Sequence, residues 1–199
     1  DYIAYNFIGQ PTKHKHIHSA AGKATQSEVY SYSYDYADRL QTTTHCLNNG
    51  PVMTLVNNEY DELGRLKHNR RNGQSNLHTN YAYNLRSWTE SISSPLFCET
   101  LYYNDTRSNP TNTRYYNGNI SGMDWSVNGD KKRGYDFSYD NLSRLLYADY
   151  LENNIRNHNF NTSYNYDKQG NIVSLMRSGN QNTTYGIIDN LTLNYRGNQ

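Results

Sequence analysis

Aromatic residues alternate with small polar residues at several separate places along the chain. Clear examples are Tyr32–Tyr34, Phe137–Tyr139 and Tyr164–Tyr166, in which every second side chain is an aromatic ring. A period of two places the rings on one face of a β-strand and the small polar side chains on the other. The pattern therefore predicts strands that bury a single aromatic face.

An acidic residue follows the last aromatic of the phrase in its four clearest copies. These copies are Tyr34-Asp35, Tyr60-Asp61, Tyr139-Asp140 and Tyr166-Asp167. A short carboxylate can accept a hydrogen bond from the backbone two residues on, and so begin a turn. Gly64 and Gly170 stand three residues later, where a positive φ carries no Cβ penalty, whereas Asp38 and Ser143 take that place in the other two copies. This order predicts a hairpin loop of about three to five residues built on a type I turn.

An aliphatic residue follows each of these turns and begins the return strand. The four residues are Leu40, Leu66, Leu145 and Ile172. We expect them to pack with the four tyrosines of the phrase along one face of the sheet.

The phrase recurs at a regular spacing. Asn6, Asp35, Asp61 and Asn84 are separated by 29, 26 and 23 residues, and Asp140 and Asp167 by 27. The 56 residues between Asn84 and Asp140 leave room for two further copies. Self-similarity at such a period is the signature of a repeat architecture. The sequence therefore predicts an all-β fold, an antiparallel meander of repeated β-hairpins in a curved or spiralling sheet. A single array would span residues 1–199, as an excised segment of a much larger protein.

Composition changes this picture in two respects. Leu, Ile, Val and Phe together number only 34, so the 21 tyrosines must supply much of the apolar area. The formal net charge of +1 argues against nucleic acid or an anionic membrane as a partner. No apolar run approaches the ~18 residues of a membrane helix, so membrane insertion is not expected.

Candidate chemistry is sparse. The recurring carboxylates at Asp35, Asp61, Asp140 and Asp167 occupy one structural position, which favours turn formation over a facing catalytic pair. The run of His14, His16 and His18 has a strand period, but no carboxylate or Cys lies nearby in the sequence to complete a metal site. We therefore expect neither catalysis nor a bound cofactor or metal.

Two pairs of residues leave alternatives open. Cys46 and Cys98 are either a disulfide between hairpins or two separate thiols, and the second alternative is favoured. Trp88 and Trp125 could form a platform on which sugar rings stack, but a sheet this poor in aliphatic residues favours their packing inside it.

The repeated phrase resembles that of the Rhs/YD-repeat family, which includes bacterial Rhs-type shell proteins and teneurin-like proteins. The matching residues are Tyr34-Asp35 with Arg39-Leu40, Tyr60-Asp61 with Gly64-Arg65-Leu66, Tyr139-Asp140 with Arg144-Leu145, and Tyr166-Asp167 with Gly170-Asn171. The resemblance implies a ribbon of hairpins that spirals into a hollow shell around a C-terminal toxin, on a secreted or cell-surface protein. The Asp-Pro-x-Gly motif that closes such shells is absent from this sequence, so self-cleavage is not implied.

These observations favour a non-catalytic structural scaffold, a wall segment of a shell that encloses or displays a toxin or effector. Its partners would be the remaining repeats and the C-terminal domain of the parent chain. A carbohydrate-binding surface module that uses exposed Trp and Tyr is the second hypothesis, and an enzyme is the third. The edges of the sheet, expected near Tyr2 to Ile8 and Leu191 to Tyr195, predict edge-to-edge self-association.

Overall fold

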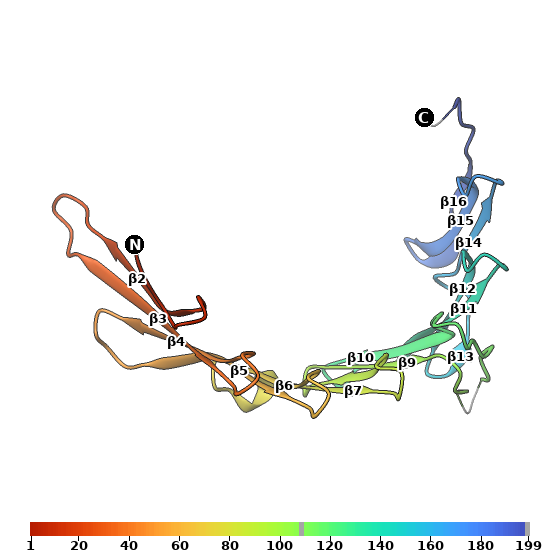
Figure 1. Ribbon diagram of the computed structural model, residues 1–199. Helices are drawn as coiled ribbons and strands as arrows, with labels where there is room; N and C mark the ends of the chain where they lie inside the picture. Colours follow the sequence, from red (N-terminus) through yellow and green to blue (C-terminus); the bar gives the residue numbers. More distant parts are fainter. Residues whose placement is uncertain (108–109, 198–199) are drawn as a thin grey trace. The chain divides into compact units, whose positions relative to one another are not determined.

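The computed structural model describes residues 1–107 and 110–197, and within them the chain is all-β (Figure 1). One short 3-10 helix, η1 (Ser75–Leu77), is the exception among these residues. The strands are β1 (Tyr2–Tyr5), β2 (Pro11–His18), β3 (Gln26–Tyr34), β4 (Leu40–Leu47), β5 (Met53–Tyr60), β6 (Leu66–Arg71), β7 (His78–Tyr83), β8 (Thr89–Ser93), β9 (Phe97–Tyr102), β10 (Gly122–Val127), β11 (Arg133–Tyr139), β12 (Leu145–Glu152), β13 (Ile155–Arg156), β14 (Thr162–Tyr166), β15 (Ile172–Gln181) and β16 (Thr184–Thr192). None of the helical structure in the described ranges has the length and apolar content needed to cross a membrane.

The strands form an antiparallel meander, as the alternation predicts. Their order in the sheet follows their order in the chain from β1 to β16, and only the short β13 lies off this path, paired with β12. The predicted Tyr and aliphatic partners lie directly opposite each other across their turns. These pairs are Tyr34 and Leu40, Tyr60 and Leu66, Tyr139 and Leu145, and Tyr166 and Ile172.

The repeated turns have the predicted backbone conformation. Gly64 and Gly170 have φ values of 83° and 94°, and Asp38 and Ser143, which replace glycine in two copies, have φ values of 60° and 62°. In each turn the residue with positive φ donates its N–H to the carbonyl of the Asp three residues earlier, as Gly64 does to Asp61 at 2.9 Å. The prediction of a type I turn followed by a left-handed residue is therefore confirmed at these positions.

A second kind of turn closes several hairpins at their other ends. Asn72 and Gly73, which follow β6, and Asn128 and Gly129, which join β10 to β11, all have positive φ. Two consecutive residues with positive φ define the type I′ turn, whose twist matches that of the strands it joins. The high Asn content of the sequence is thus used partly at positions where most other residues would be strained.

The region between Asn84 and Asp140 differs from the prediction of two further copies. Three strand junctions lie there, and at one of them, from β9 to β10, a long excursion takes the place of a short turn; residues 103–107 and 110–121 of this excursion are described. Tyr103 begins the excursion in the position of a repeat tyrosine, but no Asp follows it. Asn104 stands in its place and makes none of the turn bonds that Asp61 makes among the described residues.

The chain divides into two compact units. The first contains residues 1–82 and 92–96, and its side chains are half-buried or exposed; the second contains residues 83–91 and 97–199. All buried hydrophobic residues of the described ranges lie in the second unit. They are Tyr103, Ala148, Tyr150 and Leu151.

Aromatic contacts extend this small core across five neighbouring side chains. Ring centroids are 5.7 Å apart for Trp125 and Tyr135, 5.4 Å for Tyr135 and Tyr150, 5.0 Å for Tyr150 and Phe160, and 5.3 Å for Phe160 and Tyr185. Tyrosine does supply apolar area in this unit, as the composition predicts.

Replacement of Gly64 by Val should lower the free energy of unfolding by more than ~1 kcal/mol, because a β-branched residue is strained at positive φ. A Cβ at Gly64 would also lie 3.1 Å from Arg39 Nη1, whereas a Cβ at Gly170 would meet nothing within 4 Å. Gly170→Val is therefore the matched variant that isolates the backbone cost. Urea unfolding would measure both variants, and equal stability of Gly64→Val and the parent chain would contradict the turn assignment.

The outer edge of β16 should promote association between copies of the chain. This strand contains no Lys, Arg or Pro, the residues that commonly protect an edge, and its Ile187 and Leu191 are 52% and 46% exposed. We expect light scattering to detect oligomers that dissociate in an Ile187→Lys variant. An equivalent change at Ile3 of the much shorter β1 is the control, and a strictly monomeric parent chain would contradict the prediction.

Candidate functional site

The repeated Asp is a structural centre of each turn. In the second hairpin, Asp35 Oδ1 accepts the N–H groups of Ala37 and Arg39 at 2.9 and 3.0 Å, and its Oδ2 accepts Arg39 Nε at 2.8 Å. Asp61 and Asp140 make the same bonds, with Arg65 and Arg144 as their side-chain partners. The bond to the backbone two residues on was predicted, but the ion pair with the Arg four residues on was not.

These bonds lower the pKa of the turn carboxylates. The Arg39 side chain is the main cause of the low pKa of Asp35. The backbone N–H of Arg144 is the main cause at Asp140, and the Asn171 side chain is the main cause at Asp167. Burial alone would raise the pKa of Asp61, but the bonds from Arg65 lower it. Carboxylates held in the ionised form by local partners are suited to shaping a turn and not to donating protons at neutral pH.

The arginines of the turns also reach the next hairpin. The guanidinium of Arg39 lies 4.5 Å from the ring centroid of Tyr60, and that of Arg144 lies 4.7 Å from the ring of Tyr166. The expected packing of the repeat tyrosines along one face is thus mediated in these two places by a cation–π contact. Among the described ring contacts, none joins two of the four repeat tyrosines directly.

Tyrosine hydroxyls provide a further link between consecutive hairpins. Each donates a hydrogen bond of 2.7–3.0 Å to a backbone carbonyl located 14 to 23 residues earlier in the chain. The bonds run from Tyr34 to Pro11, Tyr60 to Leu40, Tyr103 to Thr89, Tyr139 to Ile120, Tyr166 to Leu145 and Tyr195 to Ile172. We name this set the tyrosine links. They show why the phrase needs Tyr and not Phe at this position, a distinction that periodicity alone does not make.

A buried ion network, which sequence reasoning did not find, fixes the excursion to the sheet. The Arg107 side chain is 3% exposed and pairs with Asp124 of β10 at 2.7 Å and with Asp136 of β11. Burial opposes the charged form of Arg107, but the two carboxylates raise its pKa above the usual value. Its backbone N–H donates to Asn112 Oδ1 at 2.6 Å, and Asn112 Nδ2 donates to Asp105 O at 3.3 Å. The network therefore pins the excursion onto β10 and β11.

A polar cavity of about 350 Å³ lies beside this network in the second unit. Asp136 and Asp149 both line it, and Arg156 bridges them at 2.6 and 3.2 Å. Because Arg156 lies between the two carboxylates and pairs with both, they lack the open, facing geometry of a glycosidase acid and base.

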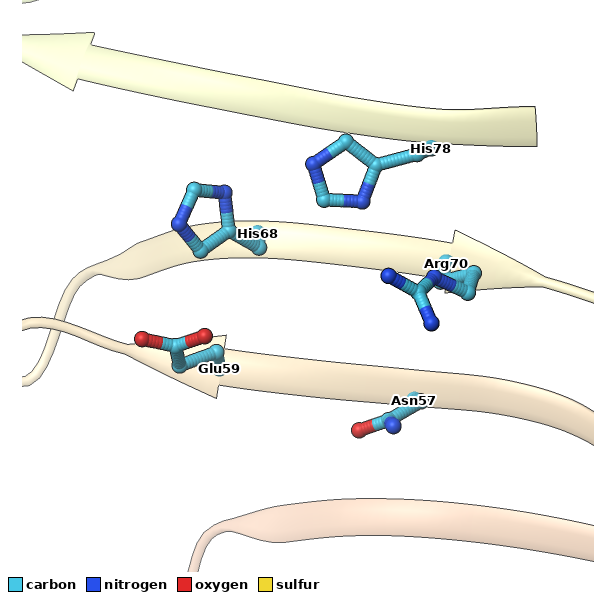
Figure 2. A pocket seen from close by; sticks show the side chains of 5 residues that line it. All are labelled: Asn57, Glu59, His68, Arg70 and His78. Atoms are coloured by element: carbon cyan, nitrogen blue, oxygen red, sulfur yellow. The ribbon is translucent and has the colours of Figure 1, made fainter. Parts of the chain in front are cut away.

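A smaller polar cavity of about 90 Å³ lies over β5, β6 and β7 in the first unit. Figure 2 shows its lining: Asn57, Glu59, His68, Arg70 and His78. The rings of His68 and His78 stack with centroids 5.2 Å apart, and each lies 2.6 Å from Asn80 Oδ1 through one ring nitrogen. Glu59 pairs with Lys67 at 3.2 Å. The lining thus combines two imidazoles, a carboxylate, an amide and a guanidinium in one small polar cavity.

The two tryptophans lie in the second unit and are only half-buried. Trp88 packs on Tyr103 with a centroid distance of 5.0 Å, and the Arg86 guanidinium lies 5.0 Å from its ring. Trp125 stacks on Tyr135. Each indole therefore contacts a tyrosine ring of the same unit.

The histidine and cysteine candidates have separate surroundings. His14 and His16 of β2 lie 3.4 and 2.6 Å from Asp1, a carboxylate distant from them in the sequence. Across residues 1–107 and 110–197, no group of three or more His, Cys, Asp or Glu is arranged to hold a metal ion. Cys46 retains its thiol, whose Sγ lies 3.2 Å from the Gly50 carbonyl, so the disulfide alternative for Cys46 and Cys98 is not adopted in this structure.

Comparison with known proteins adds little to this description. No protein-family model matches the sequence, and no curated protein is similar to it. Among solved structures, the chain is similar to TcdB2-TccC3-TEV (10% identity, TM-score 0.41) over 98% of its own length and 12% of that chain. It is also similar to TcdB2-TccC3-Cdc42 (11% identity, TM-score 0.35) over 96% of its own length and 13% of that chain. The resemblance to Rhs/YD-repeat proteins therefore rests on the repeated residues.

Proposed function

We propose that the chain is a non-catalytic scaffold, a wall segment of an Rhs/YD-repeat-type shell that encloses or displays a C-terminal toxin or effector. We further propose that the parent protein is secreted or lies on a bacterial cell surface. The tyrosine links are the observation that carries the proposal. They join successive hairpins by the same bond, so the hydroxyls of the repeated tyrosines connect each hairpin to the one before it.

The turn carboxylates support the same conclusion. Asp35, Asp61 and Asp140 each use both oxygens on the backbone and Arg of their own turn. In a repeat array each hairpin contacts only its neighbours. Turns that repeat one backbone geometry would therefore keep the strands of a shell wall in regular register.

The experiment that tests the proposal uses the parent chain with its C-terminal domain. Protease sensitivity of that domain would be compared between the parent protein and a variant with Tyr60→Phe and Tyr166→Phe, which removes two tyrosine links and keeps both rings. We expect the variant to expose the domain to cleavage. A conservative change at the 96% exposed Tyr36, Tyr36→Phe, is the control. Equal protection in all three proteins would contradict the wall-segment proposal.

The alternative function is carbohydrate binding, and a glycan array would distinguish it from a pure scaffold role. Dose-dependent binding that is lost in Trp88→Ala or Trp125→Ala would replace the pure scaffold with a carbohydrate-binding module. Hydrolysis of a bound glycan that one carboxylate substitution abolishes would contradict both proposals.

A further inference from the structure

The sequence contains four Asn-Gly dipeptides, at Asn49, Asn72, Asn117 and Asn128. Asn-Gly is chemically special because the Gly main-chain nitrogen can attack the side-chain amide carbon of the preceding Asn. Glycine has no side chain to hinder this approach. In a folded protein the reaction requires that the Gly N–H and the Asn amide are not already held by other groups.

Two of the four dipeptides are held. The Gly50 N–H donates to the Leu47 carbonyl at 2.8 Å, which engages the attacking nitrogen after Asn49. The amide of Asn117 is engaged at both ends. Its Nδ2 donates to Ser143 Oγ at 3.0 Å, and its Oδ1 accepts the Asn119 N–H at 3.1 Å.

The other two dipeptides lie at the centres of exposed type I′ turns. Asn72 and Gly73 have φ values of 50° and 61°, and Asn128 and Gly129 have φ values of 49° and 72°. These turns close through the next residue, from Gln74 N to Arg71 O at 3.1 Å and from Asp130 N to Val127 O at 2.9 Å.

The closing bonds leave both attacking nitrogens unengaged. Within the part of the chain that the structure describes, neither the Gly73 nor the Gly129 N–H has a hydrogen-bond partner, and neither do the side-chain amides of Asn72 and Asn128. The space around both glycines is open, since a Cβ at Gly73 or Gly129 would meet nothing within 4 Å.

We propose that Asn72 and Asn128 are sites of spontaneous, self-catalysed deamidation, with water as the co-reactant. The Gly nitrogen forms a bond to the Asn side-chain carbon, the bond from that carbon to Nδ2 breaks, and the amide leaves as ammonia with the proton from the Gly nitrogen. Water then opens the resulting succinimide at one of its two carbonyls, giving either aspartate or isoaspartate. Each conversion adds one negative charge.

The consequence differs between the two products. Aspartate keeps the main chain unchanged, whereas isoaspartate inserts the side-chain methylene into the main chain. Asn128 and Gly129 lie in the connection between Val127 of β10 and Arg133 of β11, so an added main-chain atom at residue 128 lengthens this connection and alters the turn next to the Trp125–Arg133 pair. At residue 72 the same product alters the chain path between β6 and β7.

The experiment is a time course of the whole chain at 37 °C and pH 8, with site-resolved peptide mass spectrometry. We expect Asn72 and Asn128 to convert at least about tenfold faster than Asn49 and Asn117, equivalent to about 1.4 kcal/mol of activation free energy. In concentrated urea, where the hydrogen bonds are lost, the four rates should become similar.

A Ser143→Ala variant provides the matched control, because it removes the partner of Asn117 Nδ2 and leaves Asn72 and Asn128 untouched. We expect faster conversion at residue 117 only. Similar rates at all four sites in the folded chain, or faster conversion at Asn49 or Asn117 than at Asn72 and Asn128, would overturn the proposal.

Discussion

Replacement of Arg107 by Met should lower the stability of the second compact unit by about 3 kcal/mol, because breaking a buried ion pair leaves uncompensated charge. The side chains of Arg107 and Asp124 are 3% and 6% exposed, and that of Asp136 is 12% exposed. Met fills a similar volume, so the loss reports chiefly on charge and hydrogen bonding. Urea unfolding monitored by tryptophan fluorescence is the direct measurement, since both tryptophans lie in this unit.

The control for this variant is Arg177→Met. Arg177 pairs with Asp189 across β15 and β16, but its side chain is 51% exposed, and exposed ion pairs contribute at most about 1 kcal/mol. Lys132, which lies 2.7 Å from Asp124, remains in the Arg107 variant and limits the loss. Equal stability of the two variants would show that the network does not hold the excursion.

Replacement of Tyr139 by Ala should destabilise the chain by ~3 kcal/mol or more, as the truncation of a large aromatic side chain does. Tyr139 packs edge-on against Tyr115 with centroids 5.2 Å apart and donates its hydroxyl to the Ile120 carbonyl at 2.8 Å. Tyr139→Phe separates the two contributions, because it removes only the tyrosine link and should cost about 1 kcal/mol.

The contrasting variant is Tyr36→Ala. Tyr36 stands beside Asp35 in the repeated phrase, yet it is 96% exposed, so its truncation should change the stability by less than about 0.5 kcal/mol. Chemical denaturation would measure all three variants. If Tyr139→Phe proves as damaging as Tyr139→Ala, packing of the Tyr139 ring does not contribute to stability.

The strands and short turns could be predicted because their determinants are local. A period of two, an Asp and a residue that tolerates positive φ act within a few positions of one another, and Asp35 to Leu40 contains all of them. The spacing of Asp35 and Arg39 also recurs at Asp61 and Asp140, and this regularity was a signal from which the ion pairs could have been found.

The excursion and its network could not be predicted in the same way. Arg107 pairs with residues 17 and 29 positions away, and nothing around it in the sequence distinguishes it from a surface arginine. The carbonyl partners of the tyrosine links could not be predicted either, because every residue type supplies a backbone carbonyl. Pro11, Thr89 and Ile120 accept the bond at positions equivalent to Leu40.

The tyrosine links give the array a direction that matters for how such a chain can grow in evolution. Each hairpin offers a carbonyl to the hairpin that follows it and a hydroxyl to the one that precedes it, as Tyr60 does with Leu40 and Tyr166 with Leu145. A gene segment that encodes one whole hairpin therefore carries one donor and one acceptor, and its duplication creates a new junction without any compensating substitution. Because the acceptor is a backbone carbonyl, a change of the residue that supplies it keeps the bond, whereas loss of the tyrosine hydroxyl removes it. Length in this architecture can change by whole hairpins while the joints between them remain the same.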